Sequence, residues 1–217
     1  MFKKFGSPSL RSLGYGAPSE TIQMHKVGFQ DFRFTPEKGM VYTVSRAISS
    51  RVNANYDGWP VHELRTAYKT FIGRPMFVEH NNSDHTKAKG VILDVIYKET
   101  KLASGLVDGS VYALSEVDAE SFPKLANAIM EGKLNAVSMG ADVDATICSG
   151  CHKVASKPSE FCEHIPKLKG QRVSIYKDSS RKEVLIYESC VKPNFFELSY
   201  VFDPADESAG ILAKMRT

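Results

Sequence analysis

The sequence predicts an α+β protein in which a mostly antiparallel, barrel-like β core is flanked by helices. Short segments rich in β-branched and aromatic residues recur over residues 27–202, and turn-forming residues separate them. Only three stretches have the features of a helix. With 217 residues, of which 42% are hydrophobic, the chain is long enough for one large domain. A folded or closed sheet with helices outside it accommodates both patterns.

The first 24 residues are predicted to form a flexible N-terminal arm. They combine serines with three glycines and two prolines, and they carry no periodic apolar pattern. Residues 25–217 then form the folded domain. Within it, residues 145–170 hold three of the four cysteines and are the candidate subdomain.

Strands are expected where β-branched and aromatic residues cluster. These segments are residues 27–34, 40–48, 76–80, 90–97, 102–107, 134–144, 173–176, 184–188 and 195–202. The polar residues 98–101 predict the turn of a hairpin between two of these strands.

Helices are expected in three places. In residues 60–71, apolar side chains recur near helical spacing, and Pro60 suits the helix start. Residues 118–132 show the same spacing and end at Gly132, which suits a helix C-terminus. A short closing helix is expected at residues 204–214.

Three of the predicted strands place a histidine, a serine and a carboxylate in that order along the chain. These residues are His80, Ser138 and Glu197. Because side chains alternate along a strand, Ser138 shares a face with Ala136 and Gly140. Such a face of small residues leaves room for another chain to approach, as a protease cleft requires. Glu197 points away from the most apolar face of its strand, which is expected to consist of Phe196, Leu198, Tyr200 and Phe202.

Each of these residues also has a purely structural interpretation. Ser138 alone fits a small, solvated strand face, and Glu197 alone fits a solvated position on an amphipathic strand. His85, in the loop that follows the first strand, is the competing base, although a loop histidine is more often merely exposed. His25 and His62 have no comparable context and are assigned no role.

The order and the flanking residues of the three segments resemble the prohead (capsid maturation) proteases of tailed phages, which are related in fold to the herpesvirus assemblins. The resemblance covers roughly residues 27–210, and the order and spacing of its motifs carry it, since each motif alone is weak. The similar segments are His80 with Gly90-Val91, then Val137-Ser138-Met139-Gly140, then Glu197-Leu198-Ser199-Tyr200-Val201 with Asp203-Pro204-Ala205.

The resemblance implies a serine endopeptidase that acts inside the phage procapsid in the host cytoplasm. Ser138 would attack the scissile carbonyl, His80 would take up its proton and pass it to the leaving amine, and Glu197 would orient the imidazole. The substrates would be scaffold and major capsid proteins and the chain itself, and self-association would be expected. The herpesvirus relatives use a second histidine in the third role, so the chain departs from them at Glu197.

The cysteine-bearing insertion has the spacing of a zinc site. Cys148 and Cys151 are followed by Cys162 and His164, in the pattern Cys-x2-Cys-x10-Cys-x-His. The Ser-Gly pair between the first two cysteines allows the tight turn of a zinc knuckle. Four protein ligands leave no coordination position open, so zinc would be structural and would hold an insertion too polar to fold by itself.

Other interpretations of the insertion are open. His152 and Cys190 are reserve ligands, and the segment could instead be a loop with free cysteines. A redox pair would need a helix N-terminus to lower the thiol pKa, and no such helix is predicted there. The knuckle could also bind nucleic acid through nearby basic residues, but Phe161 is its only aromatic residue suited to base stacking, and the net charge of the chain is only +3.

Charge and hydropathy argue against a nucleic-acid-binding, membrane or secreted protein. A net charge of +3 is too small to indicate a nucleic-acid or membrane partner by itself. The apolar runs are shorter than a membrane-spanning helix, and the N-terminus lacks the apolar stretch of a secretory signal, so an intracellular protein is expected. The alternative for the whole chain is a non-enzymatic phage structural protein of related fold, because a fold does not determine a function. In that case His80, Ser138 and Glu197 would not converge in space.

Overall fold

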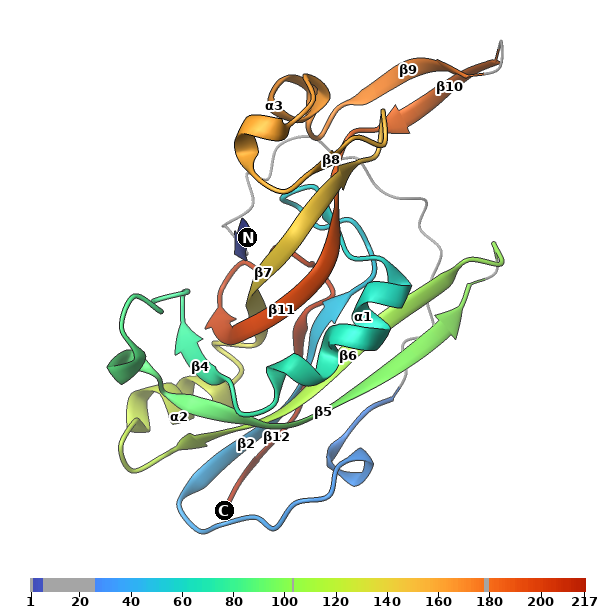
Figure 1. Cartoon of the computed structure of the whole chain (residues 1–217). Helices are drawn as coiled ribbons and strands as arrows, with labels where there is room; N and C mark the ends of the chain where they lie inside the picture. Colours follow the sequence, from blue (N-terminus) through green and yellow to red (C-terminus); the bar gives the residue numbers. More distant parts are fainter. Residues whose placement is uncertain (1, 6–25, 103, 178–179) are drawn as a thin grey trace.

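The computed structural model describes residues 2–5, 26–102, 104–177 and 180–217, and in it seven strands close into a barrel (Figure 1). Around the ring, β11 returns to β7, and every neighbouring pair is antiparallel except β4 and β11. The expectation of a barrel-like β core is thus confirmed, with one parallel pair in it. The strands, in order around the barrel, are β7 (Ala136–Cys148), β12 (Gly210–Arg216), β2 (Met40–Ser49), β6 (Val107–Asp118), β5 (Gly90–Lys101), β4 (Pro75–Val78) and β11 (Glu188–Val201).

The helices of the described residues are few and short. α1 (Val61–Ala67) continues into the 3-10 helix η2 (Tyr68–Phe71), as expected, and contacts β6 and β11. α2 (Pro123–Met130) contacts β6 and β12, and it begins later than expected because Pro123 occupies its first turn. α3 (His164–Leu168) belongs to the insertion. Among the described residues, no helix has the length and apolar character that crossing a membrane requires.

The start of the predicted flexible arm is instead a β-strand. Phe2–Phe5 form the strand β1, which pairs antiparallel with β7, because this edge of β7 offers free backbone hydrogen-bonding groups. The rest of the predicted arm, residues 6–24, lies outside the described residues, and so does His25. A further short strand, β3 (Asp57–Gly58), pairs parallel with the first residues of β11.

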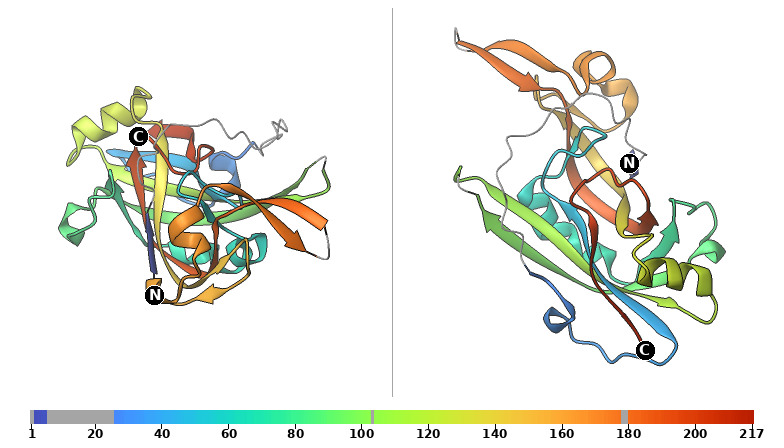
Figure 2. Two further views of the ribbon diagram at one scale, coloured as in Figure 1. Left: turned by 90° about the horizontal axis from the view of Figure 1, so that it is seen from above. Right: turned by 180° about the vertical axis from the view of Figure 1, so that it is seen from behind.

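The cysteine-bearing insertion lies at one end of the long strands β7 and β11. It contains β8 (Val154–Ala155), the 3-10 helix η4 (Pro158–Glu160) and α3. It leads into the hairpin of β9 (Arg172–Lys177) and β10 (Ser180–Leu185), which projects from the rest of the molecule (Figure 2).

The core joins the barrel to α1 and η2. Phe71 of η2 stacks on Phe195 of β11, with ring centroids 4.2 Å apart. A β-bulge between Phe195 and Glu197 shifts the side-chain alternation of β11. The expected apolar face was therefore wrong in part: Phe195 is buried with Leu198 and Tyr200, whereas Phe202 is 72% exposed.

Three predicted elements were wrong in type. Residues 27–34 contain the 3-10 helix η1 (Phe29–Asp31) in place of a strand. Residues 204–214 form a loop and most of β12 in place of a closing helix, because β12 takes the free edge of β2 and closes the ring towards β7. Residues 98–101 end β5 rather than form a turn, since their pairing with β6 continues the hairpin to Val107. In each case contacts distant in the sequence override the local pattern.

Candidate active site and metal centre

The segment that follows β4 places His80 beside β11. Glu79 and His80 both have left-handed backbone angles, with φ of 50° and 53°. Residues other than glycine adopt this conformation at a cost, and such positions cluster at functional sites. The Glu79 N–H donates to the carbonyl oxygen of Tyr200 at 3.0 Å, and this bond joins the turn to β11.

The imidazole of His80 is hydrogen-bonded to the carboxylate of Glu197. The distance from His80 Nδ1 to Glu197 Oε1 is 2.6 Å, and Ser199 Oγ donates to the other oxygen, Oε2, also at 2.6 Å. Glu197 is fully buried, at 0% exposure, so the interpretation of a solvated glutamate is wrong. A buried carboxylate requires hydrogen-bond donors on both oxygens, and these two side chains supply them.

Ser138 lies on the neighbouring strand, on the same face as this carboxylate. It is paired directly opposite Ser199, so their β-carbons are roughly 5 Å apart by sheet geometry. Gly140, two residues further along β7, is opposite Glu197, and a β-carbon there would come 2.7 Å from Glu197 Oε1. The small-residue face of β7 therefore makes room for the carboxylate.

The bond between His80 and Glu197 determines which nitrogen is basic. An ionised carboxylate only accepts hydrogen bonds, so Nδ1 carries the proton and Nε2 is the basic nitrogen. The hydroxyl of Ser199 is committed to Glu197 as a donor and is fully buried. Of the two serines in this row, Ser138 is therefore the better candidate nucleophile.

A small pocket adjoins Ser138. Apolar side chains and three polar residues line it, and more than half of the lining residues come from β2 and from the loop before β12. The lining residues are Ala47, Ile48, Asn53, Val137, Ser138, Met139, Ala205, Asp206 and Ala209.

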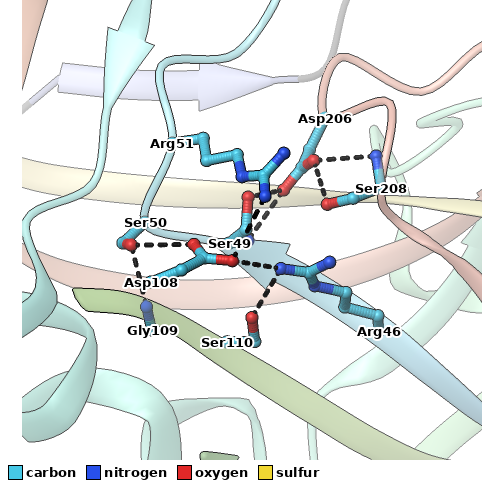
Figure 3. Close-up of polar contacts among 9 residues, drawn as sticks. All are labelled: Arg46, Ser49, Ser50, Arg51, Asp108, Gly109, Ser110, Asp206 and Ser208. Carbon is cyan, nitrogen blue, oxygen red and sulfur yellow. Dashed lines mark hydrogen bonds and ion pairs between the residues drawn. The ribbon is translucent and has the colours of Figure 1, made fainter. Parts of the chain in front are cut away.

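The loop that lines this pocket is fixed by Asp206 (Figure 3). One carboxylate oxygen accepts from the N–H and the hydroxyl of Ser49, and the other accepts from the N–H and the hydroxyl of Ser208. In the same figure, the buried pair Arg46 and Asp108 is joined at 3.0 Å. These contacts hold the end of β2 and the 203–209 loop in place beside Ser138.

The other histidines considered lie away from this arrangement. His85 begins the 3-10 helix η3 (His85–Lys87) and is exposed. His62 is in α1, where its exposed side chain lies 3.5 Å from Glu63 Oε1. The histidine that reaches Glu197 is His80.

Cys148, Cys151, Cys162 and His164 converge as the spacing predicts. Their ligand atoms all lie within 4.8 Å of one another. Four ligands of a tetrahedral zinc ion stand about 3.8 Å apart, at Zn–S distances of about 2.3 Å. The side chains of this chain thus have the identity, number and proximity that a metal ion requires.

The environment of Cys162 favours its thiolate, whereas burial raises the pKa of the Cys148 thiol to about 11. Burial opposes ionisation of Cys162, but contacts from Cys151 and a backbone hydrogen bond from Ile165 lower its pKa to about 6. The Nδ1 atom of His164 is buried and has no hydrogen-bond partner among the described residues, which suits a nitrogen reserved for a metal. At Gly150 a β-carbon would come 2.6 Å from Ile186, so the turn between the first two cysteines needs glycine.

The two reserve ligands lie outside the four-residue cluster, and two basic residues of the insertion are paired with acidic ones. His152 is exposed, and Cys190 is buried on β11 outside the four-residue cluster. Lys157 and Lys167 pair with Glu160 and Glu163 of the insertion itself.

Sequence reasoning missed a buried charge cluster beneath the insertion. Lys4 and Lys169 both contact Asp57 and Glu188, at 2.6–3.0 Å. These residues are far apart in the sequence and form no spacing pattern, so no local signal could have brought them together. Ser199 was also missed as the partner of Glu197, although it stands two residues later on the same strand face.

No family model, curated protein or solved structure matches this chain.

Proposed function

We propose that this chain is a serine endopeptidase of phage procapsid maturation, with Ser138, His80 and Glu197 as its catalytic triad. The observation that carries the proposal is the 2.6 Å bond from His80 Nδ1 to the buried Glu197 carboxylate, beside a strand that presents Ser138 on the same face. A base whose one nitrogen is oriented by a carboxylate, next to a serine, is the arrangement that acyl transfer requires.

In the proposed mechanism, Ser138 Oγ attacks the scissile carbonyl while His80 Nε2 accepts its proton. His80 then protonates the leaving amine, and the peptide bond breaks to give an acyl-serine. Water, deprotonated by the same nitrogen, hydrolyses the ester and restores the serine. Glu197 remains ionised throughout and stabilises the imidazolium, and Ser199 holds its second oxygen.

The proposed substrates follow from the resemblance to prohead proteases. They are scaffold and major capsid proteins and the chain itself, cleaved within the procapsid by self-associated copies. The barrel, in the proposed assemblin-like arrangement, provides the rigid support on which catalytic side chains keep their geometry.

A fluorophosphonate probe tests the nucleophile directly, because it reacts covalently with activated serines. We expect the wild-type chain to be labelled at Ser138 and Ser138→Ala to lose labelling without a change in melting temperature. Ser45→Ala is the matched control, since Ser45 is a buried barrel serine whose hydroxyl has no hydrogen-bond partner among the described residues. Equal labelling of wild type and Ser138→Ala would refute the assignment.

Co-expression with the cognate scaffold and capsid proteins tests the biological reaction. Intact masses should show discrete truncations with wild type and none with Ser138→Ala. Identical masses, together with no labelling, would favour the non-enzymatic structural protein of related fold.

We also propose that Cys148, Cys151, Cys162 and His164 hold a structural zinc ion. The thiolate-favouring contacts of Cys162, the proximity of the four ligand atoms and the buried His164 Nδ1 support it. The ion would cross-link the insertion and supply no open coordination position for chemistry. Elemental analysis of protein purified without chelator should give one zinc per chain, and Cys162→Ser should lower this value. Metal-free wild-type protein would contradict the proposal.

A further inference from the structure

The strand β1 occupies an edge of β7 that leads to Ser138. β1 runs antiparallel to β7, from Phe2 opposite Val143 to Phe5 opposite Gly140. Gly140 stands two residues from Ser138, so β1 is directed along β7 towards the proposed nucleophile. A peptide that continued this ladder by two residues would reach the position opposite Ser138, just before Ala209 and Gly210 take over the same edge of β7. Strand addition of this kind is a common way to bind extended peptides.

One side chain of β1 fills a buried acidic pocket. Lys4 Nζ lies 2.8 Å from Asp57 Oδ1 and 3.0 Å from Glu188 Oε1. Both carboxylates belong to residues that are only 3% exposed. Lys169, which follows α3 of the insertion, contacts the same two oxygens at 2.9 Å and 2.6 Å. Two carboxylates are thus balanced by two ammonium groups, one of which comes from β1.

The pocket is selective for a cation at the position of Lys4. Without that ammonium, one buried carboxylate would lack a counter-charge, which is strongly unfavourable. Glu188 Oε2 is buried and has no hydrogen-bond partner among the described residues, so the pocket still offers an acceptor. Lys3 differs, because it is exposed and its Nζ lies 5.6 Å from the centre of the Phe196 ring. Of the two adjacent lysines, Lys4 therefore pairs with buried carboxylates and Lys3 does not.

We propose that the β7 edge is the substrate-binding strand of this protein, that the Asp57/Glu188 pocket selects a lysine in the substrate, and that β1 is an internal occupant which substrates displace. This inference rests on the proposed role of Ser138. Lys4 is opposite Ala141, three positions along β7 from Ser138. The preferred substrates are therefore extended segments with a lysine about three residues before the cleaved bond.

Peptide binding to the full-length chain tests the pocket. A fluorescein-labelled peptide with the sequence of residues 1–8 is titrated, by fluorescence anisotropy, into the Ser138→Ala chain and into the same chain with Lys4→Glu. The second chain should bind roughly tenfold or more tightly, because its own β1 no longer competes. A Lys4→Ala peptide should lose roughly tenfold or more in affinity, whereas the matched Lys3→Ala peptide should change by less than about threefold.

Equal affinities of the two alanine peptides, or no binding to the Lys4→Glu chain, would overturn the inference. If Lys4→Glu prevents folding, as judged by circular dichroism, Lys4→Gln removes the charge without reversing it and makes the same comparison. Fluorophosphonate labelling of the wild-type chain separates the two proposals. Labelling without lysine-dependent binding overturns the pocket alone. Lysine-dependent binding without labelling supports the pocket as a peptide site and overturns the protease.

Discussion

The two candidate sites both include a residue of β7, but they are held in different ways. Ser138 and Glu197 are within the paired part of β7 and β11, where ladder hydrogen bonds and the barrel core fix their side chains. Cys148 ends β7, and the other three metal-ligand candidates are in turns and at the start of α3. The buried apolar core of the insertion consists of Cys148, Ile165 and Ile186. The first site is thus preorganised by the backbone, whereas the second, in our proposal, depends on a bound ion to hold it.

The largest effect is expected from removing the charge of Glu197, because the proposed chemistry depends on that charge and the fold does not. Glu197→Gln keeps the shape of the side chain but removes the charge that, in the proposed mechanism, stabilises the His80 imidazolium. We expect the rate of fluorophosphonate labelling to fall by roughly 10²–10⁴-fold, with little change in melting temperature. Glu131→Gln, at an exposed glutamate of the same chain, is the control. An unchanged labelling rate would mean that the preorganised site is not catalytic.

Metal removal should increase the protease sensitivity of the cysteine-bearing insertion and leave that of the barrel unchanged. Incubation with 1,10-phenanthroline should allow trypsin to cleave the chain after Lys153 and Lys167, because the insertion has little apolar core to keep its backbone folded without an ion, while the barrel resists digestion. Cys162→Ser should reproduce the effect, and His152→Asn, at an exposed histidine outside the cluster, should not. Simultaneous digestion of barrel and insertion would show that the two regions are one cooperative unit.

A single methyl group tests how closely the strand site is packed. In Gly140→Ala the new β-carbon would meet Glu197 Oε1 at 2.7 Å and the Phe196 ring at 2.8 Å. The carboxylate must then shift away from His80, so we expect labelling to slow by roughly tenfold and stability to fall by about 1–3 kcal/mol. Gly28→Ala is the control, because the nearest atoms there belong to the flexible end of Gln30. Full labelling in Gly140→Ala would show that the site tolerates displacement.

The smallest effect is expected from changing the pH around the charge cluster of Lys4, Lys169, Asp57 and Glu188, which joins the insertion to the barrel. Burial alone would raise the pKa of Glu188, but Lys169 and Lys4 lower it, so its contribution is present above the ordinary value of 4.5 and is lost as pH falls further. Burial alone would lower the pKa of Lys4, but Asp57 and Glu188 raise it to about 12, so its contribution is complete below 10.5 and is lost as pH rises through 12.

The docking of β1 should therefore be most stable between about pH 4.5 and 10.5. A fluorophore at the N-terminus should show constant anisotropy within this window and a decrease on either side of it. Lys4→Gln should abolish the alkaline transition. If that transition survives in Lys4→Gln, a group other than Lys4 anchors the strand.

The candidate metal ligands could be predicted from the sequence because they are close to one another along the chain. Cys148, Cys151, Cys162 and His164 fall within one short segment, and their spacing limits the ways in which they can meet. His80 and Glu197 are 117 residues apart, and they were paired only through resemblance to a family. The contact itself depends on β4 lying beside β11, which no local pattern predicts.

The sequence by itself determined that the chain is mainly β-structure, that α1 follows Pro60, and that the insertion collects three cysteines and a histidine. Each of these follows from composition or spacing over a few residues. The tertiary structure alone decided that β12 closes a barrel, that a bulge turns Phe195 inwards, and that Lys4 reaches Asp57 and Glu188. The physical reason is that strand pairing is made between distant segments, so the register and the neighbours of a strand depend on the whole fold.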